Sequence, residues 1–418
     1  MLSIIPLVIA LSFPAQDAPA KAPAQWTQAE LESLSAKIRG DLEKMRGLAF
    51  KRPVSVKLAD KKGFVEHARK RMEMALTPER AHRDETVAKM LGLIPPDMDL
   101  LQAYEDFMKE QVGGFYDPSS DTFYLMETFT GDLAKVILAH ELTHALDDQY
   151  YDIDGTFKTL RDETDSELAF GSVVEGSGTA AMFQWMMEHI GEMDPASLAS
   201  AGDLGMQGLD TAPQFIWKPM LAVYLRGQIF LSQSKDSGRR EGVRQAFQTL
   251  PRSSEQILHP EKYWDEKKRD EPRRIEFDTT KLPAEWKVLG EDTLGELVLA
   301  LVATPTVERK PLDATNQLAI MSLAFTNEAA EGWGGDRVLL LGKGDERRLV
   351  LVTVWDTPED AREFHAACKS VFASLPATNA ALPAGVTADL VGEGSVVLHA
   401  HWGRSAAAVT DIAWSEKK

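Results

Sequence analysis

Apolar residues recur every three or four positions in several parts of the chain, and this period predicts amphipathic helices. The first predicted helix begins at the capping box Thr27-Gln28-Ala29-Glu30 and continues with an apolar series: Leu31, Leu34, Ile38, Leu42 and Met45. A second capping box, Thr164-Asp165-Ser166-Glu167, begins a helix that should reach about residue 190. Other helical periods cover residues 61–76, 97–111, 132–150, 213–234, 293–303 and 317–325.

Alternation between apolar and polar positions predicts strands elsewhere. Residues 54–59 alternate in this way, and two aromatic runs within 113–127 flank the turn Asp117-Pro118-Ser119-Ser120, which predicts a hairpin. After about residue 282 come two predicted strands, a helix and a final pair of strands, at 337–342, 347–355, 357–375 and 390–402. The chain is therefore expected to be α+β, with a larger domain at 27–275 and a smaller α+β domain at 282–418.

The N-terminal residues MLSIIPLVIALSFPAQDAPAKAPAQ have the composition of an export signal. The apolar run from Leu2 to Phe13 is too short to cross a bilayer but has the length of a signal-peptide core, although no basic residue precedes it. Ala18-Pro19-Ala20 is a small-residue cleavage candidate. We therefore expect a signal peptide at 1–20, a disordered leader at 21–26, and a mature protein that is periplasmic or secreted.

The composition of the 418-residue chain is that of a globular protein, with 44% hydrophobic and 26% charged residues. The formal net charge of −18 argues against nucleic acid and anionic membrane surfaces as main partners. No internal apolar run is long enough to span a membrane, so no stable membrane insertion is expected. The single cysteine, Cys368, excludes an intrachain disulfide, and the oligomeric state stays open.

The stretch AKVILAHELTHALDDQYYDIDG, residues 134–155, has the strongest chemical signal. On a helix, His140 and His144 lie on one face about one turn apart, so both imidazoles can bind one ion. Glu141 is rotated by about 100° from His140, which brings its carboxylate near the ion without making it a ligand. Two histidine ligands beside a general base are typical of catalytic Zn²⁺. The same pattern can also arise by chance on an ordinary amphipathic helix.

A third ligand is required, and Glu175 on the following helix is the strongest candidate. It lies among small and apolar residues, VVEGSGTAAM, where an unpaired carboxylate would be costly to bury. Gly171, Gly176 and Gly178 weaken that helix, and a close contact with the first metal helix would offset this. The alternatives are Asp152 or Asp154 after the first helix, and Glu167 or Glu188 on the second.

The motif His140-Glu141-x-x-His144, followed on a later helix by Glu175, resembles the gluzincin class of zinc metallopeptidases. Longer strings, GFYDP, HELTHALDDQ, VVEG, SSEQILHPEKY and GWGGDR, are similar to those of secreted bacterial zincin-like proteins, mostly of unassigned function. The resemblance implies a zincin-like domain in which His140, His144 and Glu175 bind zinc. It also implies that Glu141 activates a water and that the hairpin offers an edge strand to an extended peptide.

The chain differs from the gluzincin pattern four residues after the ligand glutamate, where Thr179 replaces an aspartate that orients a histidine. Asp148 could take that role instead. Peptide hydrolysis also needs a donor to the developing oxyanion, and His259 and Tyr263 in HPEKY are candidates, as is Tyr224. Each of these three can equally be a packing residue.

These observations predict an exported zinc-dependent hydrolase, most simply a metallopeptidase that acts on a peptide or protein substrate. Glu141 would take a proton from the zinc-bound water and deliver it to the leaving amine. The alternative is a zincin-shaped binding or structural protein whose metal site is vestigial or only stabilising. The intact Glu141 argues against that alternative, because a structural zinc needs no base beside it.

Overall fold

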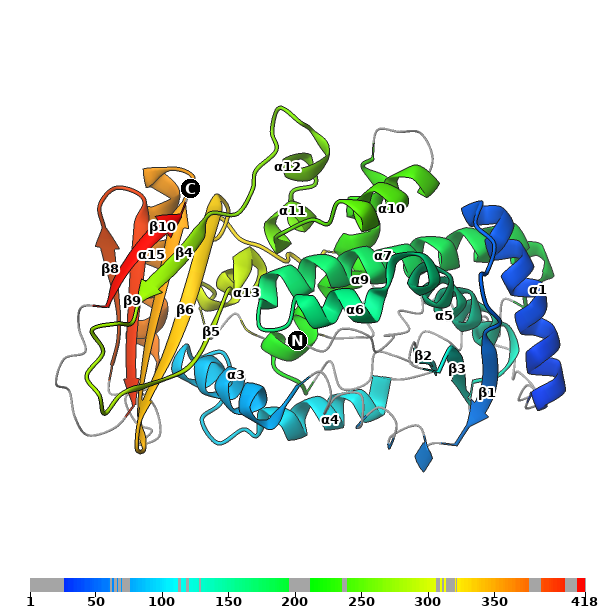
Figure 1. The fold of residues 1–418 in the computed structure, drawn as a ribbon, viewed down its shortest axis with the longest axis horizontal. Coiled ribbons are helices and arrows are strands. Elements are labelled where there is room, and N and C mark those ends of the chain that lie inside the picture. The colour runs from blue at the N-terminus through cyan, green and yellow to red at the C-terminus, as the bar shows by residue number, and fades with distance from the viewer. Residues whose placement is uncertain are drawn as a thin grey trace.

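The computed structural model describes most of the chain between Trp26 and Lys417 (Figure 1). The described residues are 26–60, 62–63, 66, 69, 76–111, 114–117, 120–127, 129–194, 211–234, 239–305, 309, 312, 320, 322–375, 385–402 and 412–417. The signal peptide predicted at 1–20 lies outside these residues, as does nearly all of the leader at 21–26. So do most of the residues in the helix predicted at 61–76, and four of the nine in the helix predicted at 317–325, whose described residues 322–325 are not helical.

The described helices and strands make the protein α+β, as the sequence predicts. The helices are α1 (Gln28–Arg46), α3 (Pro78–Met90), α4 (Leu100–Gln111), α5 (Gly131–Tyr151), α6 (Ile153–Thr159), α7 (Thr164–His189), η1 (Ile190–Glu192), α9 (Gln214–Ser232), α10 (Arg239–Gln248), α11 (Ser254–Leu258), α12 (Glu261–Trp264), α13 (Gly295–Val302) and α15 (Pro358–Ser374). The strands are β1 (Ser55–Ala59), β2 (Gly114–Asp117), β3 (Thr122–Met126), β4 (Arg274–Asp278), β5 (Lys287–Asp292), β6 (Trp333–Lys343), β7 (Glu346–Trp355), β8 (Gly385–Val391), β9 (Ser395–Trp402) and β10 (Ala413–Lys417). None of these helices is long and apolar enough to cross a membrane.

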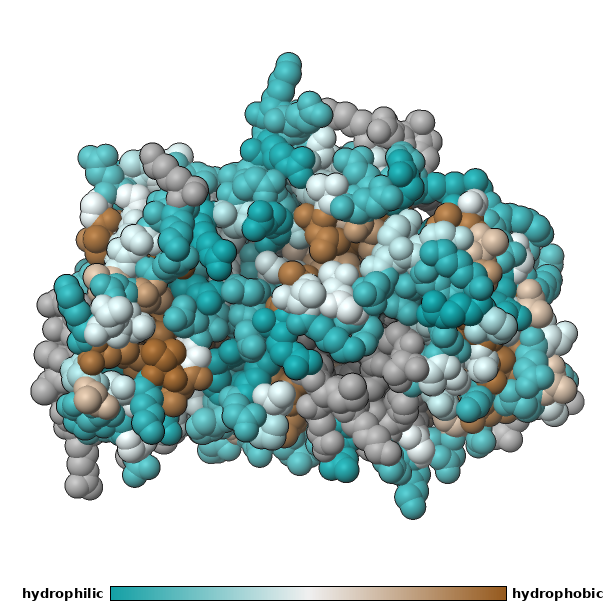
Figure 2. Space-filling model, in the orientation of Figure 1, coloured by the Kyte–Doolittle hydropathy of each residue, from teal (hydrophilic) through white to brown (hydrophobic). Residues whose placement is uncertain are grey.

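The elements are spread along the long axis of the molecule. A five-stranded sheet lies at one end and α1 with β1 at the other, with the main helices between them (Figure 1). Among these helices, α7 packs against both α5 and α9. The face seen in Figure 2 is mainly hydrophilic, in agreement with the net charge of −18.

A three-stranded sheet packs against α5, the helix that carries the HELTH string. The predicted hairpin is confirmed: β2 pairs with β3 in antiparallel fashion, while β1 pairs with the other side of β3 in parallel. The order β1-β3-β2 makes β2 an edge strand. Apolar residues of α1, this sheet and α5, among them Ile38, Phe123 and Ile137, share one core. This core therefore holds α5 and β2 in fixed positions relative to each other.

The five-stranded antiparallel sheet has the order β5-β6-β7-β9-β8 and is covered on both faces. One face shares a core with helices that include α9, α13 and α15, through residues such as Leu340, Val298 and Phe364. The other face packs against the pair β4 and β10, which is antiparallel. The domain boundary predicted between 275 and 282 falls inside this arrangement, because β4 begins at Arg274 and pairs with the C-terminal strand. The two predicted parts of the chain thus share one core.

The helix predicted from Thr164 is present as α7, but its capping box is not formed. The N-cap residue is Glu163, whose side chain makes no cap hydrogen bond. Thr164 donates its backbone N–H and its hydroxyl to Asp292 at 2.8 and 2.6 Å. Glu167 forms an ion pair with Arg80 at 2.6 Å. Distant partners have therefore taken both groups of the predicted cap, whereas the box at Thr27 and Glu30 is formed as predicted.

Asp165 is buried where the first turn of α7 meets the connection between β5 and α13. Its Oδ1 accepts the backbone N–H of Ser254 at 2.7 Å, and its own N–H donates to the carbonyl of Thr293. Burial raises the pKa of Asp165 to about 8, although the hydrogen bonds from Ser254 oppose this. The folded protein therefore keeps a proton that the unfolded chain, with a pKa of about 3.9 for aspartate, releases.

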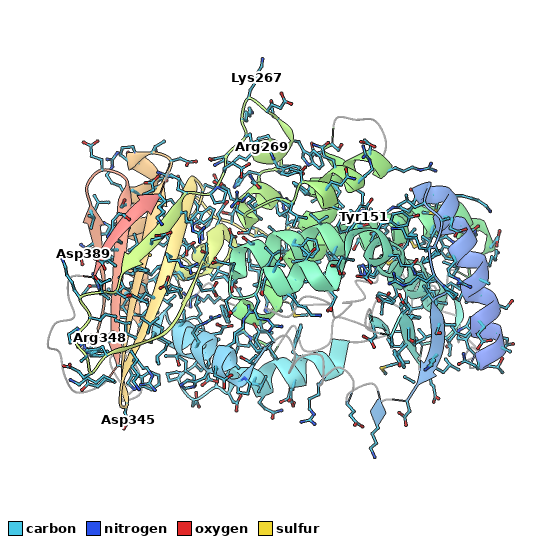
Figure 3. The ribbon with its side chains drawn as sticks, in the orientation of Figure 1. Tyr151, Lys267, Arg269, Asp345, Arg348 and Asp389 are labelled. Atoms are coloured by element: carbon cyan, nitrogen blue, oxygen red, sulfur yellow. The ribbon has the colours of Figure 1, made fainter. Side chains whose placement is uncertain are left out.

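Stability should fall as the pH rises from about 4 to about 8, because only the unfolded chain gains from ionising Asp165 in that range. The group contributes up to about 1.4 kcal/mol per pH unit to this slope. Asp165→Asn should remove that contribution in urea unfolding measured from about pH 5 to pH 8. Asp345→Asn, in the exposed turn between β6 and β7 (Figure 3), should keep it. The same slope in both variants would mean that Asp165 is ionised in the folded protein.

Candidate metal centre

His140 and His144 lie one turn apart on α5, and their rings converge. Their Nε2 atoms are 2.9 Å apart, and their ring planes are nearly perpendicular, at 89°. His140 is only 5% exposed and His144 only 2%. The spacing of four residues thus places two imidazole nitrogens at one buried position, as helix geometry predicts.

Glu175 reaches the same position from α7. Its Oε2 lies 3.1 Å from Nε2 of His140 and 3.3 Å from Nε2 of His144. Ligand atoms about 2.1 Å from a tetrahedral ion lie about 3.4 Å apart, so the three atoms have nearly the spacing of a ligand set. Two imidazole nitrogens and a carboxylate oxygen are also a donor set that suits Zn²⁺. The residues present therefore fit the ion that the sequence predicts.

The other candidates for the third ligand are engaged elsewhere. Their partners are as follows: Glu167 with Arg80, Asp154 with Lys158, Asp152 with the N–H of Gly155, and Glu188 with Gln184. Among the candidates weighed from the sequence, Glu175 is thus the one that the structure brings to the two histidines.

In the metal-free site, the carboxylate of Glu175 is ionised and favours a proton on His144. Burial opposes the charged form of His144, but the carboxylate of Glu175 outweighs it, and the pKa of His144 rises to about 9. Burial alone would raise the pKa of Glu175, yet the charge of His144 and hydrogen bonds from both histidines lower it to about 2. Burial, together with the charge of His144, lowers the pKa of His140. A metal ion that binds here must displace the proton of His144, so its affinity should rise with pH.

Glu141 is fully buried beside the histidines, and its two carboxylate oxygens have different surroundings. Its carboxylate lies within 4.8 Å of a ring nitrogen of each histidine. Oε2 accepts the backbone N–H of Tyr116, on the edge strand β2, at 3.0 Å. Oε1 has no hydrogen-bond partner among the described residues. A buried oxygen in that condition is costly unless water or a substrate group binds to it.

The acid–base properties of Glu141 suit a general base. Burial raises its pKa to about 8, with a further contribution from the nearby charge of Glu175, while the charge of His144 opposes the rise. General bases work best when their pKa lies near the operating pH. The arrangement can therefore accept a proton through Oε1 while Oε2 keeps the carboxylate in place.

Two glycines allow α7 to approach its neighbours closely. A Cβ on Gly178 would lie 2.8 Å from Cε1 of His140 and 2.8 Å from Cε1 of His144. A Cβ on Gly176 would lie 2.4 Å from the backbone of Gly227 in α9. The close approach inferred from these glycines is thus present: Gly178 faces the histidine rings, and Gly176 faces α9.

Gly178→Ala is expected to weaken zinc binding at least about tenfold, because the added methyl group must displace the two rings from their orientation. Gly40→Ala in α1 is the matched control, since no atom lies within 4 Å of the Cβ that it adds. Competition with a chelator measures the zinc affinity of both variants. Wild-type affinity in Gly178→Ala would show that the rings do not depend on this close approach.

A buried ion pair beside the metal ligands joins three helices. Arg46, at the end of α1, contacts Asp147 of α5 through both terminal nitrogens, at 2.5 and 3.3 Å. Ser177 of α7 donates to Asp147 at 2.5 Å and accepts from Arg46 at 2.7 Å. These contacts hold α5 and α7 together next to the histidines and Glu175. The sequence pattern does not reveal them, because Arg46 is far from both partners along the chain.

The residues expected to orient a histidine do not do so in the described structure. Asp148 accepts the N–H of Ile153 at 3.0 Å and lies 3.4 Å from the hydroxyl of Tyr116. The hydroxyl of Thr179 has no hydrogen-bond partner among the described residues, and neither has Nδ1 of His144. The position of the histidine rings therefore depends on packing, on Glu175 and, for His140, on a hydrogen bond with the backbone of Gly178.

Of the three predicted oxyanion donors, Tyr224 is the one that contacts a histidine. Its ring, on α9, stacks on His140 with the centroids 5.9 Å apart and the planes at 22°. His259 instead forms an ion pair with Glu296 at 3.0 Å. Tyr263 donates its hydroxyl to the carbonyl of Thr249. Neither His259 nor Tyr263 has a hydrogen bond or ring contact to the metal-site residues within the described part of the chain, and both polar groups have the partners just named.

Comparison with known proteins gives one match, to the C-terminal part of the chain. The model of a family described as a domain of unknown function (DUF8575) matches residues 286–410. No curated protein and no solved structure matches the chain. The matched segment runs from β5 to β9 and contains none of the metal-site residues. The match therefore bears on the C-terminal sheet and not on the metal centre.

Proposed function

We propose that this protein is an exported zinc-dependent hydrolase, and specifically a metallopeptidase, in which His140, His144 and Glu175 hold the metal. The observation that carries the proposal is the state of Glu141. One of its oxygens is fixed by β2, and the other lies unpartnered beside the three ligand atoms. A metal that only stabilises the fold has no use for such a group. The resemblance of the motif to gluzincins supports the same function.

Zinc bound by these residues supplies a Lewis acid that polarises the scissile carbonyl and acidifies water. Oε1 of Glu141 accepts the proton of the attacking water and carries it to the leaving amine. The N–H of Tyr116 holds the carboxylate in place through Oε2 during both transfers. Because β2 is an edge strand, an extended peptide can add to it. Such a peptide must use other backbone groups of β2, since Glu141 already occupies the N–H of Tyr116.

A second candidate function is a binding or structural protein with a stabilising zinc. The burial of the site favours it: none of His140, Glu141, His144 and Glu175 is more than 5% exposed. Structural zinc sites are closed, whereas catalytic ones keep a coordination position open. The two functions therefore differ in a measurable way, because a structural site binds zinc but cleaves nothing.

Cleavage of a peptide library by the mature, zinc-loaded protein tests the proposal, with mass spectrometry to locate the cut bonds. Cleavage that stops when a chelator removes zinc, and returns when zinc is added, supports the metallopeptidase. Stoichiometric zinc without cleavage of any peptide would support the structural site instead. Failure to bind zinc at all would contradict both functions.

A further inference from the structure

A cavity opens between α9 and the C-terminal part of the chain, and no residue of the metal centre lines it. Its volume is about 840 Å³, within the range of about 300–1,000 Å³ that is usual for ligand pockets. Gln214 and Lys218 of α9 line it, together with residues that follow α13. Most of residues 322–329 line it too, as do Glu363 and Ala366 of α15.

Lys218 lines the cavity and forms no ion pair with a described carboxylate. Its neighbours Trp217 and Pro219 are buried, Lys218 itself is half-buried, and burial lowers its pKa. Its side chain has no hydrogen bond and no ion pair in the described structure, in contrast to Lys262, which contacts three carboxylates. Withdrawing an ammonium group from water without a partner is costly. An anionic group of a ligand would remove that cost.

Glu328 and Glu363 add negative charge to the lining of the same cavity. Partial burial and nearby acidic groups, Glu328 first among them, raise the pKa of Glu363. Neither carboxylate forms an ion pair with Lys218. Other polar groups of the cavity already have partners: the Asn327 amide donates to the carbonyl of Ala300, and the Thr326 hydroxyl donates to Glu296. The lysine and the two glutamates are therefore the charges that the cavity offers to a ligand.

We propose that this cavity binds a short zwitterionic peptide, with the peptide carboxylate at Lys218 and its ammonium group at Glu328 and Glu363. Opposite charges that line one cavity without pairing suit a ligand with both charges, whereas two carboxylates repel a polyanion such as phosphate. The volume leaves room for several residues. A free amino acid has the same end groups and is the smaller source of the same chemistry. The site shares no residue with the metal centre, so it stands whether or not the chain is a peptidase.

Isothermal titration of tetra-alanine tests the site, with every protein in the Glu141→Gln background so that no peptide is hydrolysed. Tetra-alanine with free termini should bind, and Lys218→Met should weaken its binding at least about tenfold. Amidation of the C-terminus should have the same effect in the protein with intact Lys218. Lys281→Met, an exposed lysine in the turn after β4, is the matched control and should change nothing. Circular dichroism verifies that each variant is folded.

Glu363→Gln provides an independent arm, because it should weaken tetra-alanine but not its N-acetylated form. Tighter binding of free alanine than of tetra-alanine would change the ligand from a peptide to an amino acid and overturn the proposal in that respect. Three results would overturn it entirely: unchanged affinity in Lys218→Met, stronger binding of inorganic phosphate, or no binding of tetra-alanine at millimolar concentration.

Discussion

Glu141→Gln is expected to lower kcat/KM for a cleaved peptide by about 10³-fold while leaving zinc bound. Glutamine keeps the shape of the side chain, and its carbonyl oxygen can still accept the N–H of Tyr116. Its amide cannot accept a proton from water, so the general base is lost. General bases contribute about 10²- to 10⁴-fold to enzymatic rates. Because the proposed ligands are His140, His144 and Glu175 and not Glu141, the metal content should stay at the wild-type level.

The measurement pairs initial cleavage rates with zinc determined on the same sample. Glu188→Gln is the matched control, because this glutamate is exposed near the end of α7 and accepts a hydrogen bond from Gln184, a neighbour on the same helix. It should keep both activity and zinc. Activity within tenfold of wild type in Glu141→Gln would exclude the role of base. Loss of zinc in the same variant would show instead that Glu141 serves the metal.

The helix of the HELTH string and the convergence of its histidines could be predicted because the information is local. A period of 3.6 residues places His140 and His144 on one face wherever the helix lies. Glu175 could be predicted as the third ligand because it lies among small and apolar residues, where an unpaired carboxylate is costly to bury. The partner of Glu141 could not be found in this way. Tyr116 contributes a backbone N–H, a group that every residue except proline has, and only the packing of β2 against α5 brings it to the carboxylate.

Local patterns failed where distant residues compete for the same groups. Thr164 and Glu167 have the spacing of a capping box, yet Asp292 and Arg80 bind them instead. Both groups form hydrogen bonds with charged side chains of distant segments, and such bonds are stronger than hydrogen bonds between neutral groups. The residues of the HPEKY string also have distant partners. The imidazole of His259 is held by Glu296, and no short motif contains both residues.

In the C-terminal part, the sequence predicts the strands β6, β7 and β9 but not β4, β5 and β10. The apolar runs of β6 and β7 are continuous because both faces of the sheet are buried, which is readily recognised from sequence. The strands β4 and β10 are short and largely polar, and each becomes a strand by pairing with the other across most of the C-terminal half. That pairing also explains why a boundary placed between 275 and 282 does not separate two cores.

Glu175→Gln is expected to reduce zinc affinity by at least about 100-fold. The substitution removes the charged oxygen that lies 3.1 and 3.3 Å from the two histidine nitrogens. Loss of an outer-shell partner already costs about 10- to 100-fold in metal affinity, and a ligand should cost more. Metal-free protein should change as well, because Glu175 is the main group that raises the pKa of His144. Without it, His144 should be neutral in the buried site near pH 7.

Loss of zinc must be separated from loss of the fold, and the same helix offers the control. Glu167→Gln breaks the buried ion pair with Arg80, so it should lower the melting temperature yet leave zinc affinity unchanged. In Glu175→Gln, by contrast, zinc affinity is lost. Added zinc should therefore no longer raise the melting temperature of this variant, because a ligand stabilises the native state only when it binds that state. Zinc affinity retained in Glu175→Gln would rule out Glu175 as the third ligand. The histidines would then still bind the metal, with the third ligand outside the residues that converge on them in this structure.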